Sequence, residues 1–130
     1  MTEAKATVLV VDDIASNREL LEALLVDLGH DVRLAADGVA AIASVEAAPP
    51  DLILLDIDMP RLNGLEVCRR LKAHPRHRLI PIVIITAHAD RAWRLAGLDA
   101  GADDLLTKPI GPQALRRAID LFKPSTEVPS

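Results

Sequence analysis

A small set of residues in this chain could together handle a phosphoryl group, and each member follows a short apolar segment. The set consists of Asp12, Asp13, Asp56, Thr86 and Lys108. Carboxylate oxygens are preferred ligands of Mg²⁺, and an aspartate is an established covalent phosphoryl acceptor. A lysine ammonium and a threonine hydroxyl can neutralise and hydrogen-bond phosphoryl oxygens. The pattern predicts phosphoryl transfer to Asp56, which ends the apolar run Leu-Ile-Leu-Leu.

Short apolar segments alternate along the chain with segments of helical period. Strands are expected at residues 7–11, 31–35, 52–56, 80–85 and 104–107. Helices are expected from a capping box at Ser16 onward, after a turn at Asp37, and at residues 64–73, 90–100 and 115–122. Such alternation indicates right-handed βαβ units. The predicted fold is α/β: a doubly wound, five-stranded parallel sheet with five helices, in the order 2-1-3-4-5 that places the first and third strands side by side.

Parallel strands bring their carboxyl ends to one edge of a sheet, which is where ligands bind in open α/β folds. The acidic pair, Asp56, Thr86 and Lys108 should therefore meet there, although they are far apart in the sequence. Carboxylates this close repel, and one of them would keep its proton unless a cation intervened. A hard divalent ion with oxygen ligands satisfies them, so Mg²⁺ is the expected cofactor.

Composition excludes several other functions. The 130 residues fit one domain, and 50% of them are hydrophobic, which is enough for a buried core. A net charge of -4 argues against direct nucleic-acid binding and against an anionic membrane surface. The single cysteine, Cys68, excludes a disulfide framework and fits a core thiol in a reducing cytosol. With no signal peptide and no apolar run of membrane-spanning length, a cytoplasmic location is expected.

The chain resembles the receiver domain of bacterial two-component response regulators, over roughly residues 8–122. The motifs that carry the resemblance are Asp12-Asp13, Leu55-Asp56 with Met59-Pro60, Asn63-Gly64, Thr86-Ala87, Gly101 to Asp104, and Lys108-Pro109. Each motif alone is weak, but their order and spacing are specific. The resemblance implies a flavodoxin-like receiver domain at residues 1–123, with 124–130 a tail or the start of a linker.

The resemblance also implies a role for each site residue. Asp56 is the phosphoacceptor, while Thr86 and Lys108 contact the phosphoryl group. Mg²⁺ binds Asp13, Asp56 and the backbone carbonyl of Asp58, with Asp12 acting largely through water. The peptide bond from Lys108 to Pro109 is cis. The residues expected to change on activation or to tune the phosphoryl lifetime are Thr86, Ala87, His88, Leu105 and Asp58.

A receiver domain implies partners rather than a substrate. The phosphoryl group comes from a sensor histidine kinase or a histidine phosphotransfer protein. The phosphorylated domain then controls an output domain or protein, and residues 90–104 faintly resemble receivers attached to cyclic-di-GMP enzymes. A phosphorylation-dependent homodimer is a further option. Such a domain is not an enzyme, beyond catalysing its own phosphorylation and dephosphorylation.

The chain departs from the receiver pattern in two places. Most receivers carry an aromatic residue three positions before the lysine, and this chain has Leu105, so switching is expected to rely on Thr86 and residues 87–100. Winged-helix regulators usually carry Glu and Arg in the last helix, where this chain has Ala114 and Ala118. The absence of those charges lowers the expectation of that type of dimer and of a DNA-binding output.

Helical spacing assigns inner and outer faces to the helices. Leu20 in the first helix, Val39 in the second and Leu95 and Leu98 in the fourth are expected to face the core. Trp93 lies about 200° from Leu95 around the helix, so it is expected to be exposed. An exposed Trp is a good anchor for a partner. Trp93, Arg94 and Leu105 are therefore the predicted partner face, although a Trp lying flat on its own helix is the simpler interpretation.

Several side chains have an ordinary structural interpretation beside the functional one. Asp58 and His88 flank the predicted site, but they could equally be solvated loop residues. Asp103 and Asp104 are acidic enough for a metal, yet a turn entering the last strand is the better interpretation. His30, His74 and His77 show no partner pattern and are expected at the surface.

Two other functions compete with the receiver interpretation. A haloacid dehalogenase-type phosphatase also uses Asp-x-Asp after an apolar strand, followed by a Thr and a Lys. In that family the motif normally opens the chain and acidic residues follow the lysine, whereas here Asp12-Asp13 precede the motif and Asp103-Asp104 precede Lys108. The other competitor is a receiver-like scaffold that is never phosphorylated. Such a scaffold would be expected to lack Asp56, Lys108 or the acidic pair, and all are present.

Overall fold

Apolar runs rich in Val, Ile and Leu form the strands, and segments of helical period form the helices between them. A computed structural model describes residues 5–58, 64–88 and 90–122. The strands are β1 (Thr7–Val11), β2 (Asp31–Ala35), β3 (Leu52–Asp56), β4 (Ile82–Thr86) and β5 (Asp104–Thr107). The helices are α1 (Ala15–Asp27), α2 (Gly38–Ala47), α3 (Gly64–Ala73), α4 (Arg91–Asp99) and α5 (Pro112–Phe122). The predicted alternation of strands and helices is confirmed.

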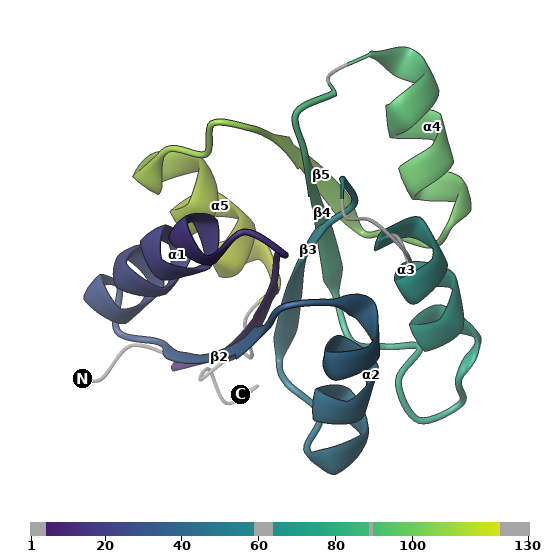
Figure 1. The fold of residues 1–130 in the computed structure, drawn as a ribbon, viewed down its shortest axis with the longest axis horizontal. Helices are drawn as coiled ribbons and strands as arrows, with labels where there is room; N and C mark the ends of the chain where they lie inside the picture. The colour runs from purple at the N-terminus through teal and green to yellow at the C-terminus, as the bar shows by residue number, and fades with distance from the viewer. Residues whose placement is uncertain (1–4, 59–63, 89, 123–130) are drawn as a thin grey trace, which may run out of the picture.

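All neighbouring strands pair in parallel, in the order β2-β1-β3-β4-β5. Figure 1 shows α1 and α5 on one face of this sheet and α2, α3 and α4 on the other. The doubly wound fold predicted from the sequence is therefore confirmed. Val11 is in register with Leu55, so the residues that follow them, Asp12 and Asp56, leave the sheet at the same level.

The central strands are buried on both faces, which explains their continuous apolar runs. Side chains of Val10, Leu54 and Val83 point toward α1 and α5, where they join one core cluster. Their sequence neighbours Leu9, Ile53 and Ile84 point the opposite way, into the cluster beneath α2, α3 and α4. Each fully buried Leu or Ile contributes about 1.5–3 kcal/mol. These two core clusters, one on each face of the sheet, hold the strand ends that carry the candidate site.

The predicted capping box at Ser16 does not form. Helix α1 begins at Ala15, and its N-cap position is occupied by Ile14, whose side chain makes no cap hydrogen bond. The reason is the preceding turn, in which Oδ1 of Asp12 accepts the backbone N–H of Ile14 at 2.9 Å. Ser16 is therefore already inside the helix. The Asp12 side chain starts the helix as well as belonging to the acidic pair.

Four apolar residues predicted to face the core are exposed instead. Leu20 and Val39 lie on the outer faces of α1 and α2, and Leu95 and Leu98 of α4 are 55% and 60% exposed. In α4 the buried residue is Gly97, at which a Cβ atom would lie 3.3 Å from Cδ1 of Ile84 and 3.6 Å from Cδ1 of Leu105. The glycine lets α4 approach the sheet on that side and turns Leu95 and Leu98 outward.

Trp93 and two histidines are also less exposed than predicted. Trp93 is half-buried and packs against the core cluster beneath α2, α3 and α4, so the prediction of an exposed Trp was wrong. His30 is buried, and its Nδ1 accepts the backbone N–H of Ala6 at 3.1 Å. His77 is buried, with its ring stacked on that of His74 at 4.2 Å. Strand β4 begins at Ile82, two residues later than predicted, after Pro81.

None of the helices in the described parts of the chain is long and apolar enough to span a bilayer.

Candidate functional site

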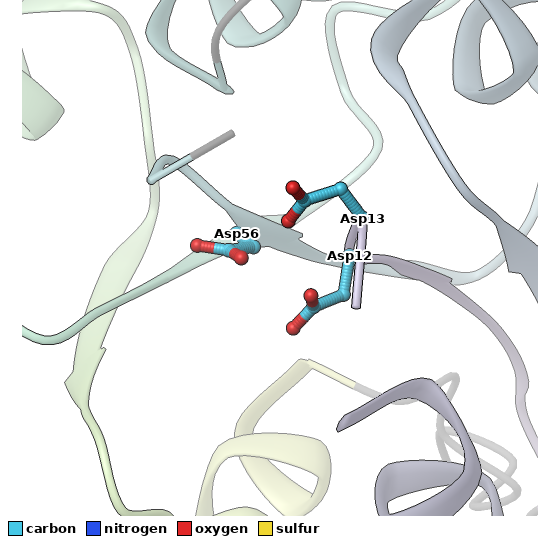
Figure 2. A group of neighbouring side chains, drawn as sticks. All are labelled: Asp12, Asp13 and Asp56. Atoms are coloured by element: carbon cyan, nitrogen blue, oxygen red, sulfur yellow. The ribbon is translucent and has the colours of Figure 1, made fainter. Parts of the chain in front are cut away.

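Three carboxylates meet where β1 and β3 end. Asp12 and Asp13 follow β1, Asp56 is the last residue of β3, and one oxygen from each lies within 4.8 Å of the others. Figure 2 shows Asp12 and Asp13 extending from the chain beside Asp56. Asp12 and Asp56 are buried, whereas Asp13 is exposed and opens the cluster to solvent. The structure thus brings together the acidic residues that the sequence predicted.

Asp56 is only 2% exposed, and both of its carboxylate oxygens have partners. The backbone N–H of Asp58 donates to Oδ1 at 2.8 Å, and the Lys108 ammonium lies 3.2 Å from Oδ2. Burial raises the pKa of Asp56 above its usual range, and the charge of Asp12 raises it further; the Asp58 N–H and Lys108 oppose both effects. A cation bound among these carboxylates would oppose the desolvation and the repulsion that raise this pKa.

The donor set fits Mg²⁺. All three side chains offer hard oxygen ligands, and Mg²⁺ favours sites with few carboxylates that leave room for water and phosphate. The carboxylate of Asp58 does not belong to this cluster, because it is turned toward Thr86. Asp58 therefore adds no side-chain oxygen to this cluster, and its backbone carbonyl as a metal ligand stays a prediction.

Lys108 reaches the site from the loop after β5. Its backbone N–H donates to the carbonyl oxygen of Thr86 at 2.8 Å, which anchors the loop to the end of β4. The peptide bond between Lys108 and Pro109 is cis, as expected. A pocket of about 310 Å³ opens beside Lys108, lined mainly by apolar residues together with Asp12 and Asn17.

Thr86 is fully buried at the end of β4, and its hydroxyl group has two partners. It donates to Oδ1 of Asp58 at 3.1 Å and accepts the backbone N–H of His88 at 3.1 Å. The N–H of Ala87 donates to Oδ2 of Asp58 at 3.0 Å. The structure therefore joins Thr86, Ala87, His88 and Asp58, all of which the sequence placed in the switch region, into one hydrogen-bonded group.

His88 links this group to α4. Its Nε2 lies 3.7 Å from Oδ1 of Asp58, and its ring stacks on Trp93 with centroids 4.8 Å apart and an interplanar angle of 14°. Of the predicted partner face, Arg94 is exposed, while Trp93 and Leu105 are half-buried against the core. Nothing in the helical spacing signals the stack, because it depends on a loop residue.

Two further contacts were not predicted. Gly64 begins α3 directly above the site, where a Cβ atom would lie 2.6 Å from the carbonyl oxygen of Asp56. Lys72 pairs with Asp103 at 2.8 Å, and the same Asp103 oxygen accepts the N–H of Ile82 at 2.8 Å. The Asp103 carboxylate therefore binds Lys72 and the Ile82 N–H at the amino edge of the sheet, which agrees with its interpretation as a turn residue rather than a metal ligand. No short-range signal could have shown a pairing across 31 residues.

A model of the response regulator receiver domain matches residues 8–120. The chain belongs to the response regulator receiver domain family. Response regulator PleD of Caulobacter vibrioides is 50% identical over 105 residues, which are 81% of this chain and 23% of PleD. Response regulator MprA of Mycobacterium avium is 46% identical over 108 residues, or 83% of this chain and 46% of MprA. The chain thus spans less than half the length of both relatives.

Solved receiver structures share the fold. Chemotaxis protein CheY4 of Vibrio cholerae superposes with a TM-score of 0.86 at 32% identity, covering 92% of this chain and 99% of CheY4. The receiver domain of sensor histidine kinase PA1611 from Pseudomonas aeruginosa has a TM-score of 0.84 at 36% identity, covering 92% and 98%, and holds a magnesium ion in its active-site cleft. The receiver assignment made from the sequence is confirmed, and the domain is a phosphoacceptor switch of two-component signalling.

Neither competing function gains support. As a phosphatase acid, Asp58 would have to present a proton to a leaving group, but its carboxylate instead accepts hydrogen bonds from Thr86 and Ala87. The relatives are response regulators rather than phosphatases. A scaffold that is never phosphorylated is unsupported as well, because the acidic cluster and Lys108 are assembled.

Proposed function

We propose that Asp56 accepts the phosphoryl group that operates this receiver, from a sensor histidine kinase or a histidine phosphotransfer protein. The observation that carries the proposal is the ion pair between buried Asp56 and Lys108 beside two further carboxylates. A buried carboxylate in contact with a lysine is a poor place for a purely structural charge, because desolvation costs free energy that the pair only partly recovers. The same arrangement suits an acceptor whose product carries additional negative charge.

In the transfer, an oxygen of Asp56 forms a bond to phosphorus while the bond from phosphorus to the histidine nitrogen of the donor breaks. The nitrogen keeps the electron pair of that bond. Lys108 is placed to follow the charge, since its ammonium already contacts Oδ2 of Asp56. Phosphoryl transfer requires mainly positioning and charge neutralisation, and Thr86 and Ala87 provide hydrogen-bond donors close by. Loss of the group to water would use the same residues, so the domain acts only on its own phosphoryl group.

Asp12, Asp13, Asp56 and the backbone carbonyl of Asp58 would hold the Mg²⁺ ion. When bound, the ion supplies positive charge that offsets the repulsion between the carboxylates and the incoming phosphoryl oxygens. Asp13 is the exposed member of the cluster, so it lies on the side of the site that is open to solvent. Asp12 has the additional task of starting α1 through its bond to the Ile14 N–H.

For the output, we propose a partner face on α4 that differs from the one predicted. Arg94 remains in it, and the outward leucines Leu95 and Leu98 take the place of Trp93. Leu105 lies beneath the helix rather than on its surface. The partner is an output domain or protein, with a cyclic-di-GMP enzyme as one candidate class and a phosphorylation-dependent homodimer as another. The receiver proper is assigned to residues 1–123 and the tail to 124–130, in a cytoplasmic protein.

The test is incubation with Mg²⁺ and acetyl phosphate followed by intact mass measurement. The wild-type protein should gain the mass of one phosphoryl group, and excess chelator should prevent the gain. Asp56→Asn should show none, whereas the control Asp51→Asn, at the opposite edge of the sheet before β3, should behave as wild type. Absence of an adduct in the wild-type protein, together with failure to bind beryllofluoride, would refute the proposal.

A further inference from the structure

Hydrogen-bond donors from two strand ends converge on the carboxylate of Asp58. The Thr86 hydroxyl lies 3.1 Å from Oδ1, the Ala87 N–H donates to Oδ2 at 3.0 Å, and the Lys108 ammonium lies 3.9 Å from Oδ2. Since the Thr86 oxygen accepts the N–H of His88, the hydroxyl hydrogen is directed at Asp58. A hydroxyl, a backbone N–H and an ammonium form a binding site for a compact anion.

This anion site lies directly beside the phosphoacceptor. The Asp58 N–H donates to Oδ1 of Asp56 at 2.8 Å, and Lys108 contacts Asp56 at 3.2 Å as well as facing Asp58. A phosphoryl group on Asp56 would place its oxygens among the donors that Asp58 now occupies. Two anions at such short range repel each other strongly, so both cannot share these donors.

We infer that the Asp58 carboxylate is an internal substitute for the phosphoryl group, and that phosphorylation of Asp56 displaces it. The inference rests on the proposed phosphorylation of Asp56 and adds a competing role for Asp58. Before phosphorylation, Asp58 already holds the Thr86 hydroxyl and the Ala87 N–H in an anion-bound arrangement. Phosphorylation then moves the Asp58 carboxylate away from these donors.

The displaced carboxylate leaves a second neighbour, which carries the change to α4. Nε2 of His88 lies 3.7 Å from Asp58, and the His88 ring stacks on Trp93 at 4.8 Å. Trp93 packs on the core beneath α4. Loss of the Asp58 contact therefore changes the environment of the stack. This route needs no aromatic residue at position 105, where the chain has Leu105.

The decisive experiment measures the affinity for beryllofluoride, a phosphoryl analogue, by fluorine NMR at saturating Mg²⁺. Asp58→Ala removes the competing anion and should tighten binding about tenfold, because the Thr86 hydroxyl and the Ala87 N–H are then free to bind the fluorides. The control Asp99→Ala makes the same change of charge at an exposed position on α4 and should bind as wild type. Equal affinities for the wild-type protein and Asp58→Ala would overturn the inference.

A double-mutant cycle separates competition from a general charge effect. Thr86→Val removes the hydroxyl for which Asp58 competes, so the gain from Asp58→Ala should shrink in that background. An undiminished gain would mean that only local charge matters and would also overturn the inference. If Thr86→Val does not fold, the amide resonance of Ala87 provides the test instead. This resonance should shift in unliganded Asp58→Ala and should move back towards its wild-type position when beryllofluoride is added. An Ala87 resonance unaffected by Asp58→Ala would count against displacement.

The proposed function and this inference fail in different ways. If neither the wild-type protein nor Asp58→Ala binds beryllofluoride or accepts a phosphoryl group, the assignment of Asp56 is wrong. If both do so equally well, Asp56 is the acceptor and only the role of Asp58 is wrong.

Discussion

Lys108 Nζ lies 3.2 Å from Oδ2 of Asp56, so the loop after β5 is tied directly to the end of β3. These strands are not neighbours in the sheet, since β4 lies between them. The pair spans that gap across the carboxyl edge, where the Lys108 backbone also binds the Thr86 carbonyl. Charge at Asp56 is thereby coupled to the position of the β5–α5 loop.

Removing the lysine should slow phosphorylation. Lys108→Ala is expected to reduce the rate with acetyl phosphate by roughly tenfold to a hundredfold, as follows from losing about 1.5–3 kcal/mol of charged hydrogen bonding. Lys108→Arg should retain part of the rate, and Lys5→Ala, at an exposed ion pair, should retain all of it. The measurement is the time course of intact mass. An unchanged rate in Lys108→Ala would show that the observed ion pair has no part in the transfer.

Mg²⁺ should stabilise the folded chain through the acidic cluster. At a free concentration one hundred times the dissociation constant, binding to the native state alone adds about 2.7 kcal/mol to the free energy of unfolding. Asp13→Asn should abolish most of this gain without unfolding the protein, because Asp13 is exposed. Thermal unfolding with and without excess chelator provides the comparison. Equal Mg²⁺ stabilisation of wild type and Asp13→Asn would exclude Asp13 as a ligand.

Gly64 should tolerate no side chain. A Cβ atom there would lie 2.6 Å from the Asp56 carbonyl oxygen and 2.6 Å from Cα of Ile57, so backbone would have to shift. Gly64→Ala is expected to lower the free energy of unfolding by about 1–3 kcal/mol and to impair phosphorylation. The matched control is Gly111→Ala, where a Cβ atom meets nothing within 4 Å. Denaturant unfolding of both variants checks this, and equal stabilities would contradict the close approach.

The Cys68 thiol should make stability depend on alkaline pH. Burial raises its pKa to about 11 from 9.0. In the unfolded chain the thiol ionises first, so unfolding is increasingly favoured as the pH rises from 9 towards 11. Cys68→Ala lacks this contribution, and its stability deficit relative to wild type should therefore shrink over that range. The measurement is denaturant unfolding at each pH, and a constant deficit would mean that the thiol titrates alike in both states.

Trp93 should contribute more to the stability of the fold than the exposed leucines of α4 do. Trp93→Ala is expected to lower the free energy of unfolding by about 2 kcal/mol, since the ring is half-buried against the core. Leu95→Ala, at an exposed position two residues further along α4, should change it by no more than about 0.5 kcal/mol. Chemical denaturation compares the two. The reverse order would restore the orientation of α4 predicted from helical spacing.

The fold and the acidic cluster could be predicted because they depend on patterns that tertiary context does not override. Doubly buried strands have continuous apolar runs, and parallel strands gather their ends at one edge, so Asp12, Asp56 and Lys108 had to approach one another. The direction of α4 could not be predicted in this way. It depends on Gly97, which has no side chain and so lets Ile84 and Leu105 pack close to the helix backbone. A prediction of the inner face from the spacing of apolar side chains does not count a glycine.

The contacts of Asp58 were also beyond the sequence. A short acidic side chain after a strand is compatible with solvent, metal or a neighbouring loop, and only the positions of Thr86 and Ala87 decide among them. The same holds for the stack of His88 on Trp93, which joins a loop to a helix. The contacts around Asp58 and His88 were therefore less predictable than the position of Asp56 in the acidic cluster.

The most direct test of the central claim locates the phosphoryl group in the chain. Protein phosphorylated with acetyl phosphate and Mg²⁺ is reduced with borohydride, which converts an aspartyl phosphate to homoserine, and the product is sequenced by tandem mass spectrometry. The structure predicts homoserine at position 56 and unmodified Asp12, Asp13 and Asp58. Homoserine at any of those three positions, with position 56 unchanged, would contradict the assignment of Asp56 as the phosphoacceptor.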